Sequence, residues 1–424
     1  MDRRRRRGAA PEDETMRAIA PLFFLASLLA SGLLSACGGD DDETRPSLDP
    51  SDAGSPPGAD DGGTSDAAPD VRPPFDGAAP EIACAVTPCM KRIVAGPTHY
   101  CAFGSDGIVR CWGNPSALGD FAARSSGAPG ASPVVIDSVG EIVDVGASAL
   151  RTCVALADGG VDCFGKDTPS PTRVAVATDA RKLAIGDDRN CAIGATGELV
   201  CWGDSDATGK GDTTMSLEGE KATAAVISER AAFAVGATGA LFSWGADPVM
   251  LGRDTPLSAD WTPDRVAGLG ATLQVAASDR HVCALTTGGR LFCWGHGDNG
   301  ALGLGSIRTV STPTEVLFAG PAWPAQVAVA LTHSCVRMTD SSVACWARVN
   351  TSGELGHAER TGVYVPTRVS LPKPVAAVAT GTGSTCVLAT DGSVQCWGDN
   401  SYGQLGLGQR DGQRHYVPTA VVFP

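Results

Sequence analysis

Short apolar segments alternate with polar and glycine-rich turns from about residue 82 to the C-terminus, and one unit of this pattern recurs seven times. Each unit contains an aromatic residue, usually between a cysteine and a glycine. The seven marks are Cys111-Trp112-Gly113, Cys163-Phe164-Gly165, Cys201-Trp202-Gly203, Ser243-Trp244-Gly245, Cys293-Trp294-Gly295, Cys345-Trp346-Ala347 and Cys396-Trp397-Gly398. They are 38 to 52 residues apart, which predicts a repeat architecture such as a propeller or a solenoid.

A second position lies ten residues before each mark and is occupied by Cys101, Cys153, Cys191, Phe233, Cys283, Cys335 and Cys386. Between the two positions a turn separates two short strands, so each segment is predicted to be an antiparallel hairpin. If the cysteines face each other, the first turn is the three-residue loop Ser105-Asp106-Gly107, whose last position favours glycine. Glycine fills that position in six repeats, and Ser341 fills it in the other.

Six repeats therefore bring two cysteines face to face, close enough for a disulfide. The predicted pairs are Cys101 with Cys111, Cys153 with Cys163, Cys191 with Cys201, Cys283 with Cys293, Cys335 with Cys345, and Cys386 with Cys396. Repeat four has Phe233 and Ser243 instead, so no thiol is left over there. Each bridge should stabilise the fold by roughly 2.5–3 kcal/mol. Zinc is the alternative, but thiolate zinc sites favour closer cysteine spacing, so no metal site is predicted.

A glycine-rich loop follows several marks, then a Pro-x-x-Val strand and a strand of small residues. The clearest loop, from Cys396 to Gly408, reads Cys-Trp-Gly-Asp-Asn-Ser-Tyr-Gly-Gln-Leu-Gly-Leu-Gly. It resembles the repeat of the regulator of chromosome condensation family, and the resemblance covers residues 92–424. That family implies an all-β, seven-bladed β-propeller with four-stranded antiparallel blades.

The ends of the repeat region suggest how such a ring closes. The chain enters at Arg92 without a preceding Pro-x-x-Val strand, and it leaves with such a strand, Pro418 to Pro424. We therefore expect the C-terminal strand to join blade one, which would remove an open sheet edge.

A basic residue, an apolar run and Leu34-Ser35-Ala36-Cys37 occupy residues 16–37. This arrangement is similar to a bacterial lipoprotein signal, in which the peptide is cleaved before a cysteine that becomes diacylated. Residues 1–36 are thus predicted to be a signal segment starting at Met16, with lipidation at Cys37. A single transmembrane anchor is the alternative, since the run is near the minimum that spans a bilayer.

Residues 37–81 are predicted to be a disordered acidic tether. Residues 40–81 carry a net charge of −10 and no apolar period, so ordering them would have no compensation. Calcium binding and mimicry of DNA are weaker alternatives for this segment. Residues 82–424, the predicted propeller, carry −6 of the total −14, and this acidic balance argues against a nucleic-acid partner.

The cysteine count of fifteen is odd. Lipid on Cys37 and six hairpin bridges account for thirteen, and Cys84 and Cys89 most simply form a seventh bridge, leaving no free thiol. Disulfides on this scale are typical of exported proteins.

Candidate chemistry is sparse. His99, His281 and His333 share one repeat position, but other blades have Arg, Ala or Ser there, so a hydrogen-bonded structural role is favoured over a metal site. No nucleophile, acid–base or phosphate-loop motif is present, so neither catalysis nor a cofactor is predicted. Aromatic residues at loop ends suit protein recognition, although they also suit packing between blades. The candidate binding residues are Trp261, Tyr364 and Tyr416.

These observations predict a monomeric lipoprotein of the cell envelope, facing the periplasm or the cell surface, that binds a protein or glycan and is not an enzyme. The family resemblance implies guanine nucleotide exchange as one alternative. Inhibition of a secreted or periplasmic enzyme such as a β-lactamase is another.

Overall fold

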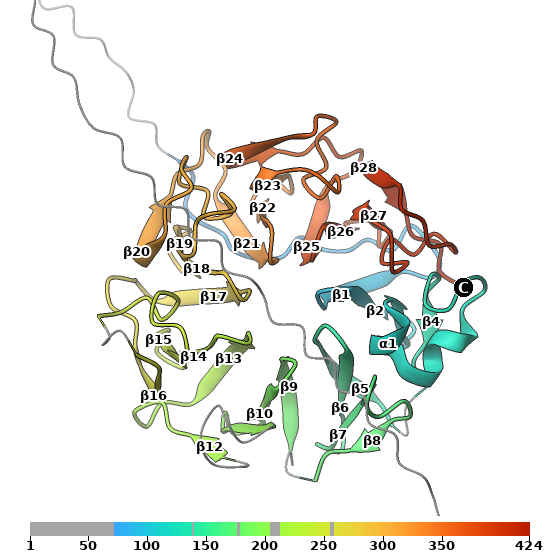
Figure 1. Ribbon diagram of the computed structural model, residues 1–424, viewed down its shortest axis with the longest axis horizontal. Helices are drawn as coiled ribbons and strands as arrows, with labels where there is room; N and C mark the ends of the chain where they lie inside the picture. Colours follow the sequence, from blue (N-terminus) through green and yellow to red (C-terminus); the bar gives the residue numbers. More distant parts are fainter. Residues whose placement is uncertain (1–71, 138–139, 176–178, 204–212, 255–257) are drawn as a thin grey trace, which may run out of the picture. The chain divides into compact units, whose positions relative to one another are not determined.

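The computed structural model describes residues 72–137, 140–175, 179–203, 213–254 and 258–424. They form seven four-stranded antiparallel sheets, each with its strands in chain order, set as blades around a central axis (Figure 1). The predicted all-β seven-bladed propeller is confirmed. The predicted signal segment 1–36 and residues 37–71 of the predicted tether lie outside the described residues.

The first three blades are formed by β1 (Met90–Ala95), β2 (His99–Gly104), β3 (Val109–Gly113) and β4 (Val134–Val135); by β5 (Ile142–Ala147), β6 (Arg151–Leu156), β7 (Val161–Gly165) and β8 (Thr172–Arg173); and by β9 (Ala180–Ile185), β10 (Arg189–Gly194), β11 (Leu199–Gly203) and β12 (Thr213–Met215). In each blade the first strand lies nearest the axis (Figure 1).

The other four blades are formed by β13 (Ala222–Ile227), β14 (Ala231–Gly236), β15 (Leu241–Gly245) and β16 (Asp260–Arg265); by β17 (Thr272–Ala277), β18 (His281–Thr286), β19 (Leu291–Gly295) and β20 (Val310–Val316); by β21 (Pro324–Val329), β22 (Ser334–Met338), β23 (Val343–Val349) and β24 (Thr361–Arg368); and by β25 (Val375–Gly381), β26 (Ser384–Ala389), β27 (Val394–Asp399) and β28 (Arg414–Ala420).

The middle two strands of each blade form the predicted hairpin. Cys101 pairs directly with Cys111, and Phe103 pairs with Val109, so residues 105–107 make the turn. Its last residue, Gly107, has φ of 75°, the left-handed conformation that glycine adopts without strain. Ser341 adopts the same conformation in blade six, with φ of 63°, and is the departure that the sequence indicated.

All seven predicted disulfides are present in the described residues. The six hairpin bridges join Cα atoms 4.0 to 4.1 Å apart, and the Cys84–Cys89 bridge joins Cα atoms 5.3 Å apart. In blade four, Phe233 and Ser243 form the corresponding cross-strand pair and are fully buried. In blade four, the Phe233 ring and the Ser243 hydroxyl therefore occupy the position of the disulfide.

The hydrophobic core is divided among the contacts between neighbouring blades. Seven clusters of buried residues occur in the described part of the chain, and each joins two adjacent blades. Six of them have 10 to 13 buried members, including at least one aromatic residue. The cluster between blades two and three has seven members and no buried aromatic residue. The ring is thus least well packed at that contact.

The expected ring closure by the C-terminal strand is wrong. Strand β28 pairs with β27 of its own blade, with Gln395 opposite Ala420. Blade one has its own fourth strand, β4, in which Val134 lies opposite Cys111. The reason is Pro133, which starts a Pro-x-x-type strand that the insertion at residues 120–132 separates from its mark.

Side chains close the ring instead. The Tyr100 hydroxyl lies 2.8 Å from the Ser384 hydroxyl, and the Trp112 indole N–H donates to the Gln404 carbonyl at 3.0 Å. Phe423, in the C-terminal tail, packs edge-on against Trp112 with ring centroids 5.5 Å apart. Blades one and seven therefore meet by the same kind of packing as other neighbours.

The segment from residue 72 to residue 89 lies across blades five to seven before the chain enters blade one. The Arg72 guanidinium donates to the Phe318 carbonyl at 2.8 Å, and the Trp323 indole donates to the Pro73 carbonyl at 2.8 Å. Further along, the Ala83 amide donates to the Thr390 carbonyl at 2.7 Å. This segment links three blades on the face where the β-hairpins turn.

Candidate functional site

A central cavity of about 580 Å³ runs into the ring on the face that carries the loops between the first and second strands of each blade. Each blade contributes one residue to the cavity wall from the same repeat position, four residues before the first hairpin cysteine or its equivalent. These residues are Pro97, Ala149, Asp187, Glu229, Asp279, Leu331 and Thr382, and we call them the rim ring. Three consecutive blades are acidic at this position, and the other four are uncharged.

The acidic half of the rim ring is not neutralised within the described residues. Neighbouring arginines have other partners: Arg230 pairs with Asp247 at 3.2 Å, and Arg280 pairs with Asp298 at 3.1 Å. The charge of Asp279, followed by burial and the charge of Asp187, raises the pKa of the Glu229 carboxyl. Unneutralised carboxylates of this kind leave a negative potential at the cavity mouth.

Backbone amides hold two of these carboxylates in place. Asp187 accepts from the Ala149 amide at 2.9 Å, and Asp279 accepts from the Glu229 amide at 2.8 Å. On the opposite half, Leu331 and Tyr402 also line the cavity and are 38% and 45% exposed. The mouth therefore joins an acidic half to a partly apolar half.

Each of the three equivalent histidines is fully buried and binds a hydroxyl on the next blade. His99 Nε2 lies 2.8 Å from Thr152 Oγ1, His281 Nε2 lies 2.6 Å from Ser334 Oγ, and His333 Nε2 lies 2.8 Å from Thr385 Oγ1. Each hydroxyl in turn donates to a loop carbonyl of the histidine's own blade: Ala117, Ala301 and Glu354 respectively. We call each histidine, hydroxyl and carbonyl an interblade relay.

The direction of these bonds fixes the protonation of the histidines. A carbonyl can only accept, so the hydroxyl proton is used there and the histidine must donate through Nε2–H. Burial lowers the pKa of His99 to about 4 and that of His281 and His333 to about 3. The imidazoles are therefore neutral at physiological pH, which fits the structural role favoured from the sequence.

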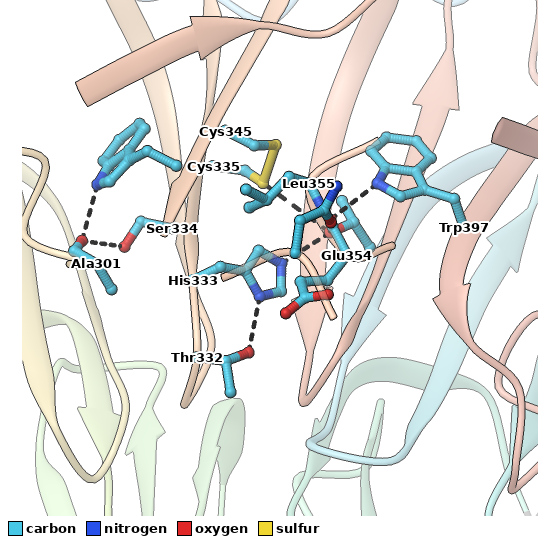
Figure 2. Close-up of a disulfide and its surroundings, with 12 residues drawn as sticks. Ala301, Thr332, His333, Ser334, Cys335, Cys345, Glu354, Leu355 and Trp397 are labelled. Carbon is cyan, nitrogen blue, oxygen red and sulfur yellow. Dashed lines mark hydrogen bonds between the residues drawn. A yellow bond between two sulfur atoms is a disulfide. The ribbon is translucent and has the colours of Figure 1, made fainter. Parts of the chain in front are cut away.

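Tryptophans of the repeat marks bind the same loop carbonyls. The Trp346 indole donates to the Ala301 carbonyl at 2.8 Å, and the Trp397 indole donates to the Glu354 carbonyl at 2.9 Å. Figure 2 shows these carbonyls beside the Cys335–Cys345 disulfide, with Ser334 directed at Ala301 and Trp397 directed at Glu354. The Ala301 and Glu354 carbonyls thus each receive two hydrogen bonds from the following blade.

The predicted binding aromatics lie on three different blades and do not come together. Trp261 on β16 is partly buried, and the Arg189 guanidinium stacks over it at 4.4 Å. Tyr364 on β24 is 38% exposed, and its carbonyl accepts from the Gly305 amide of the preceding blade at 3.0 Å. Tyr416 on β28 is partly buried near Gly353 of the preceding blade. All three lie at contacts between blades, the alternative that the sequence left open.

The remaining predicted site residue, Cys37, lies outside the described residues. Within the described ranges, no group of three or more His, Cys, Asp or Glu side chains is arranged to hold a metal ion. None of the helices among those residues has the length and apolar character needed to cross a membrane.

The rim ring was not identified from the sequence, although a signal for it exists. Alignment of the repeats on the hairpin cysteines places Asp187, Glu229 and Asp279 in one column. The hydroxyl members of the relays form a second column, one residue before those cysteines. Both columns can be seen in the sequence, but the roles of their residues depend on contacts between blades that the repeat pattern does not specify.

Comparisons with known proteins agree with this architecture. Residues 273–301, 288–337, 375–404 and 391–424 match profiles described as the Regulator of chromosome condensation (RCC1) repeat, so the chain contains repeats of this type. A similar protein is the Ultraviolet-B receptor UVR8 of Arabidopsis thaliana, 26% identical over 356 residues, which span 78% of this chain and 70% of that receptor. The probable E3 ubiquitin-protein ligase HERC6 of Homo sapiens is 32% identical over 145 residues, but these span only 14% of its length.

Solved structures show the same fold at low identity. Prp20p from Saccharomyces cerevisiae has a TM-score of 0.65 and 17% identity, covering 79% of this chain and 87% of that one. Human WBSCR16 has a TM-score of 0.66 and 19% identity, covering 75% of this chain and 95% of that one. These likenesses show that the chain shares the propeller fold.

Proposed function

We propose that this protein is a non-catalytic binding scaffold of the cell envelope, anchored by lipid on Cys37, whose propeller holds a protein partner on the face with the rim ring. The observation that carries the binding role is the concave mouth of about 580 Å³, acidic on three blades and partly apolar on the others. Such a mouth complements a partner surface on which a basic side chain lies beside an apolar one.

Two further observations support the proposal. RCC1-type propellers include Prp20p, whose structure was described with its binding to Gsp1p and histones, and yeast RCC1 (Prp20), which was solved with Kap60 bound. The seven disulfides support export, because bridges on this scale persist in oxidising compartments. They weigh against an exchange factor for a cytosolic GTPase.

The anchor is tested by membrane fractionation. The wild-type chain should partition with membranes, and Cys37→Ser should move it to the soluble fraction while leaving the propeller folded. Unchanged fractionation of Cys37→Ser would contradict the lipid anchor and favour a transmembrane segment. Globomycin, which blocks signal cleavage of lipoproteins, should cause precursor to accumulate.

The binding face is tested by crosslinking and capture from the cell envelope with the full chain. A variant with Asp187→Asn, Glu229→Gln and Asp279→Asn should lose most of the specific partner and leave thermal stability nearly unchanged. A control with Asp137→Asn, Asp158→Asn and Asp340→Asn changes charge by the same amount away from the cavity. Equal capture by both variants would exclude the rim ring as the binding surface.

A further inference from the structure

The contact between blades two and three lacks the loop that other blades place over their neighbour. Only residues 166–171 connect β7 to β8, whereas residues 296–309 connect β19 to β20. Trp202 of blade three is partly exposed, while Trp112, Trp294, Trp346 and Trp397 are fully buried. The missing glycine-rich loop therefore leaves a notch over Trp202.

The loops of blades four to seven share one chemical pattern where they meet the next blade. A residue whose carbonyl accepts from the tryptophan indole is followed by a buried leucine and then by a glycine with positive φ. The four examples are Met250-Leu251-Gly252, Ala301-Leu302-Gly303, Glu354-Leu355-Gly356 and Gln404-Leu405-Gly406. A Cβ on Gly303 would approach Trp346 Nε1 to 2.7 Å, so the glycine lets the chain lie directly against the indole.

Blade one covers its neighbour, blade two, with a different structure. Its insertion forms α1 (Pro115–Leu118), capped by Asn114, and the 3₁₀ helix η1 (Gly119–Arg124). Phe121 packs edge-on against Phe164 of blade two at 4.9 Å, and the Ala117 carbonyl accepts from Thr152. Blade two is therefore covered although its neighbour lacks the usual loop, and blade three is not covered by blade two.

Within the described part of the chain, the Trp202 indole, which a loop would bind, is left without a partner at the notch. No described residue accepts a hydrogen bond from the Trp202 indole. Asn190 lies directly across the strand pair from Trp202, at the position of Thr152, Ser334 and Thr385, whose hydroxyls face the preceding blade's loop. Asn190 is 1% exposed, and its Oδ1 has no hydrogen-bond partner.

We propose that this notch is a binding site for a Leu-Gly turn of another protein, which takes the place of the missing loop. The partner's carbonyl before the leucine would accept a hydrogen bond from the partly exposed Trp202 indole. The leucine would pack on the partly buried residues at the edge of the cluster between blades two and three, such as Val174. This proposal rests on the proposed scaffold function and specifies the kind of segment that the scaffold would bind.

The chain supplies its own probe for this site. A fluorescein-labelled peptide with the sequence of residues 398–408, Gly-Asp-Asn-Ser-Tyr-Gly-Gln-Leu-Gly-Leu-Gly, is titrated with the purified full chain, and binding is followed by fluorescence anisotropy. The wild-type chain should bind it saturably. The same peptide with valine at the position of Gly406 should not bind, because a side chain there would meet the indole. Equal binding of both peptides would overturn the proposal.

Protein variants locate the binding. Trp202→Phe should weaken peptide affinity about 5- to 10-fold, the usual effect of losing one hydrogen bond in a partly buried site. Trp346→Phe is the matched control, because its indole is already bound by Ala301 and its loss should leave peptide affinity unchanged. A Trp202→Phe chain that binds the peptide as well as wild type overturns the proposal.

A loop graft separates this site from the broader scaffold function. Residues 166–171 are replaced by residues 296–309, which should fill the notch from within and abolish peptide binding. If the peptide binds through Trp202 but the chain captures no envelope partner, the notch stands and the scaffold function fails. In the converse case, the peptide does not bind the wild-type chain, but the graft variant and the wild-type chain capture the same envelope partner equally. The notch proposal is then wrong and the scaffold function stands.

Discussion

The contact between blades six and seven and the contact between blades two and three are built from the same repeat positions but held together differently. In the first, His333, Thr385 and the Glu354 carbonyl form an interblade relay beneath the buried Trp397. In the second, Arg151 and Asn190 occupy the corresponding positions, and Arg151 lies 4.0 Å from Asp167 of its own blade. A repeat can thus keep its strands and its disulfide while losing the polar link to its neighbour.

The difference shows that the hairpin within a blade and the contact between neighbouring blades are stabilised by separate interactions. The hairpin is stabilised locally by its bridge and turn, as in Cys191–Cys201 of blade three and Cys386–Cys396 of blade seven. Docking of one blade on the next depends on the loop after the third strand, which supplies a carbonyl and a leucine. Where the loop is short, the hairpin survives and the tryptophan of the next blade, Trp202, is left partly exposed.

The largest expected effect is the pH dependence of the contacts that have relays. The pKa of His99 is lowered to about 4, and that of His281 and His333 to about 3, from a usual value of 6.5. The unfolded chain therefore binds protons below pH 6.5 that the folded chain does not bind until about pH 4 or 3, so stability falls as the pH falls through that window. Each histidine should cost about 2 kcal/mol between pH 7 and pH 5.

Urea unfolding at the two pH values measures this loss, and His333→Gln isolates one relay. The glutamine amide can still donate to Thr385 but does not titrate in this range. The variant should therefore lose about 2 kcal/mol less than wild type on acidification. An identical loss in both proteins would show that His333 is not the buried neutral donor described above.

Removal of the hydroxyl in one relay should have the next largest effect. Thr385→Val deletes the acceptor of His333 Nε2–H and one of the two donors to the Glu354 carbonyl, and it leaves the buried imidazole unsatisfied. The expected cost is about 2–3 kcal/mol in the free energy of unfolding, measured by chemical denaturation. Thr367→Val, on the outer strand of blade six, is the control and should change stability by less than about 0.5 kcal/mol.

The sevenfold repeat predicted a propeller or a solenoid built of hairpins, and the family resemblance implied the four-stranded blades of a seven-bladed propeller. The Cys101–Cys111 register, the turn at Gly107 and the six hairpin bridges all followed from spacing and turn chemistry, which are local, and the Cys84–Cys89 bridge followed from the cysteine count. The closure at β28 did not follow, because an insertion hid the strand that begins after Pro133. Strand pairing between Val134 and Cys111 is a contact across that insertion, and no local pattern specifies it.

The candidate sites were less predictable for a related reason. The three histidines were visible, but each partner hydroxyl is 52 or 53 residues away on another blade. Asp187, Glu229 and Asp279 lie on three consecutive blades, far apart in the sequence, and come together only around the central axis. Trp261, Tyr364 and Tyr416 attracted attention because they break the pattern, yet they lie at contacts between blades.

Substitution of equivalent tryptophans sharpens the comparison further. Trp397→Phe removes an indole N–H bound to the Glu354 carbonyl in a fully buried site, and it should cost about 2 kcal/mol. Trp202→Phe removes an indole that binds no described acceptor, so it should cost less than about 1 kcal/mol. Thermal and urea denaturation of the pair measure the difference. Equal costs would mean that Trp202 is held by a partner as Trp397 is.

The smallest expected effect has the opposite sign. Asn190→Val removes a buried amide whose Oδ1 has no partner and replaces it with a side chain favoured in strands. A buried unsatisfied acceptor costs about 1 kcal/mol, so the variant should be more stable than wild type by about that amount. Thr385→Val removes polar atoms at the same repeat position and should destabilise, because there the relay uses them. A loss of stability in both variants would show that Asn190 already has a structural role, and the contrast between the two contacts would then fail at its central residue.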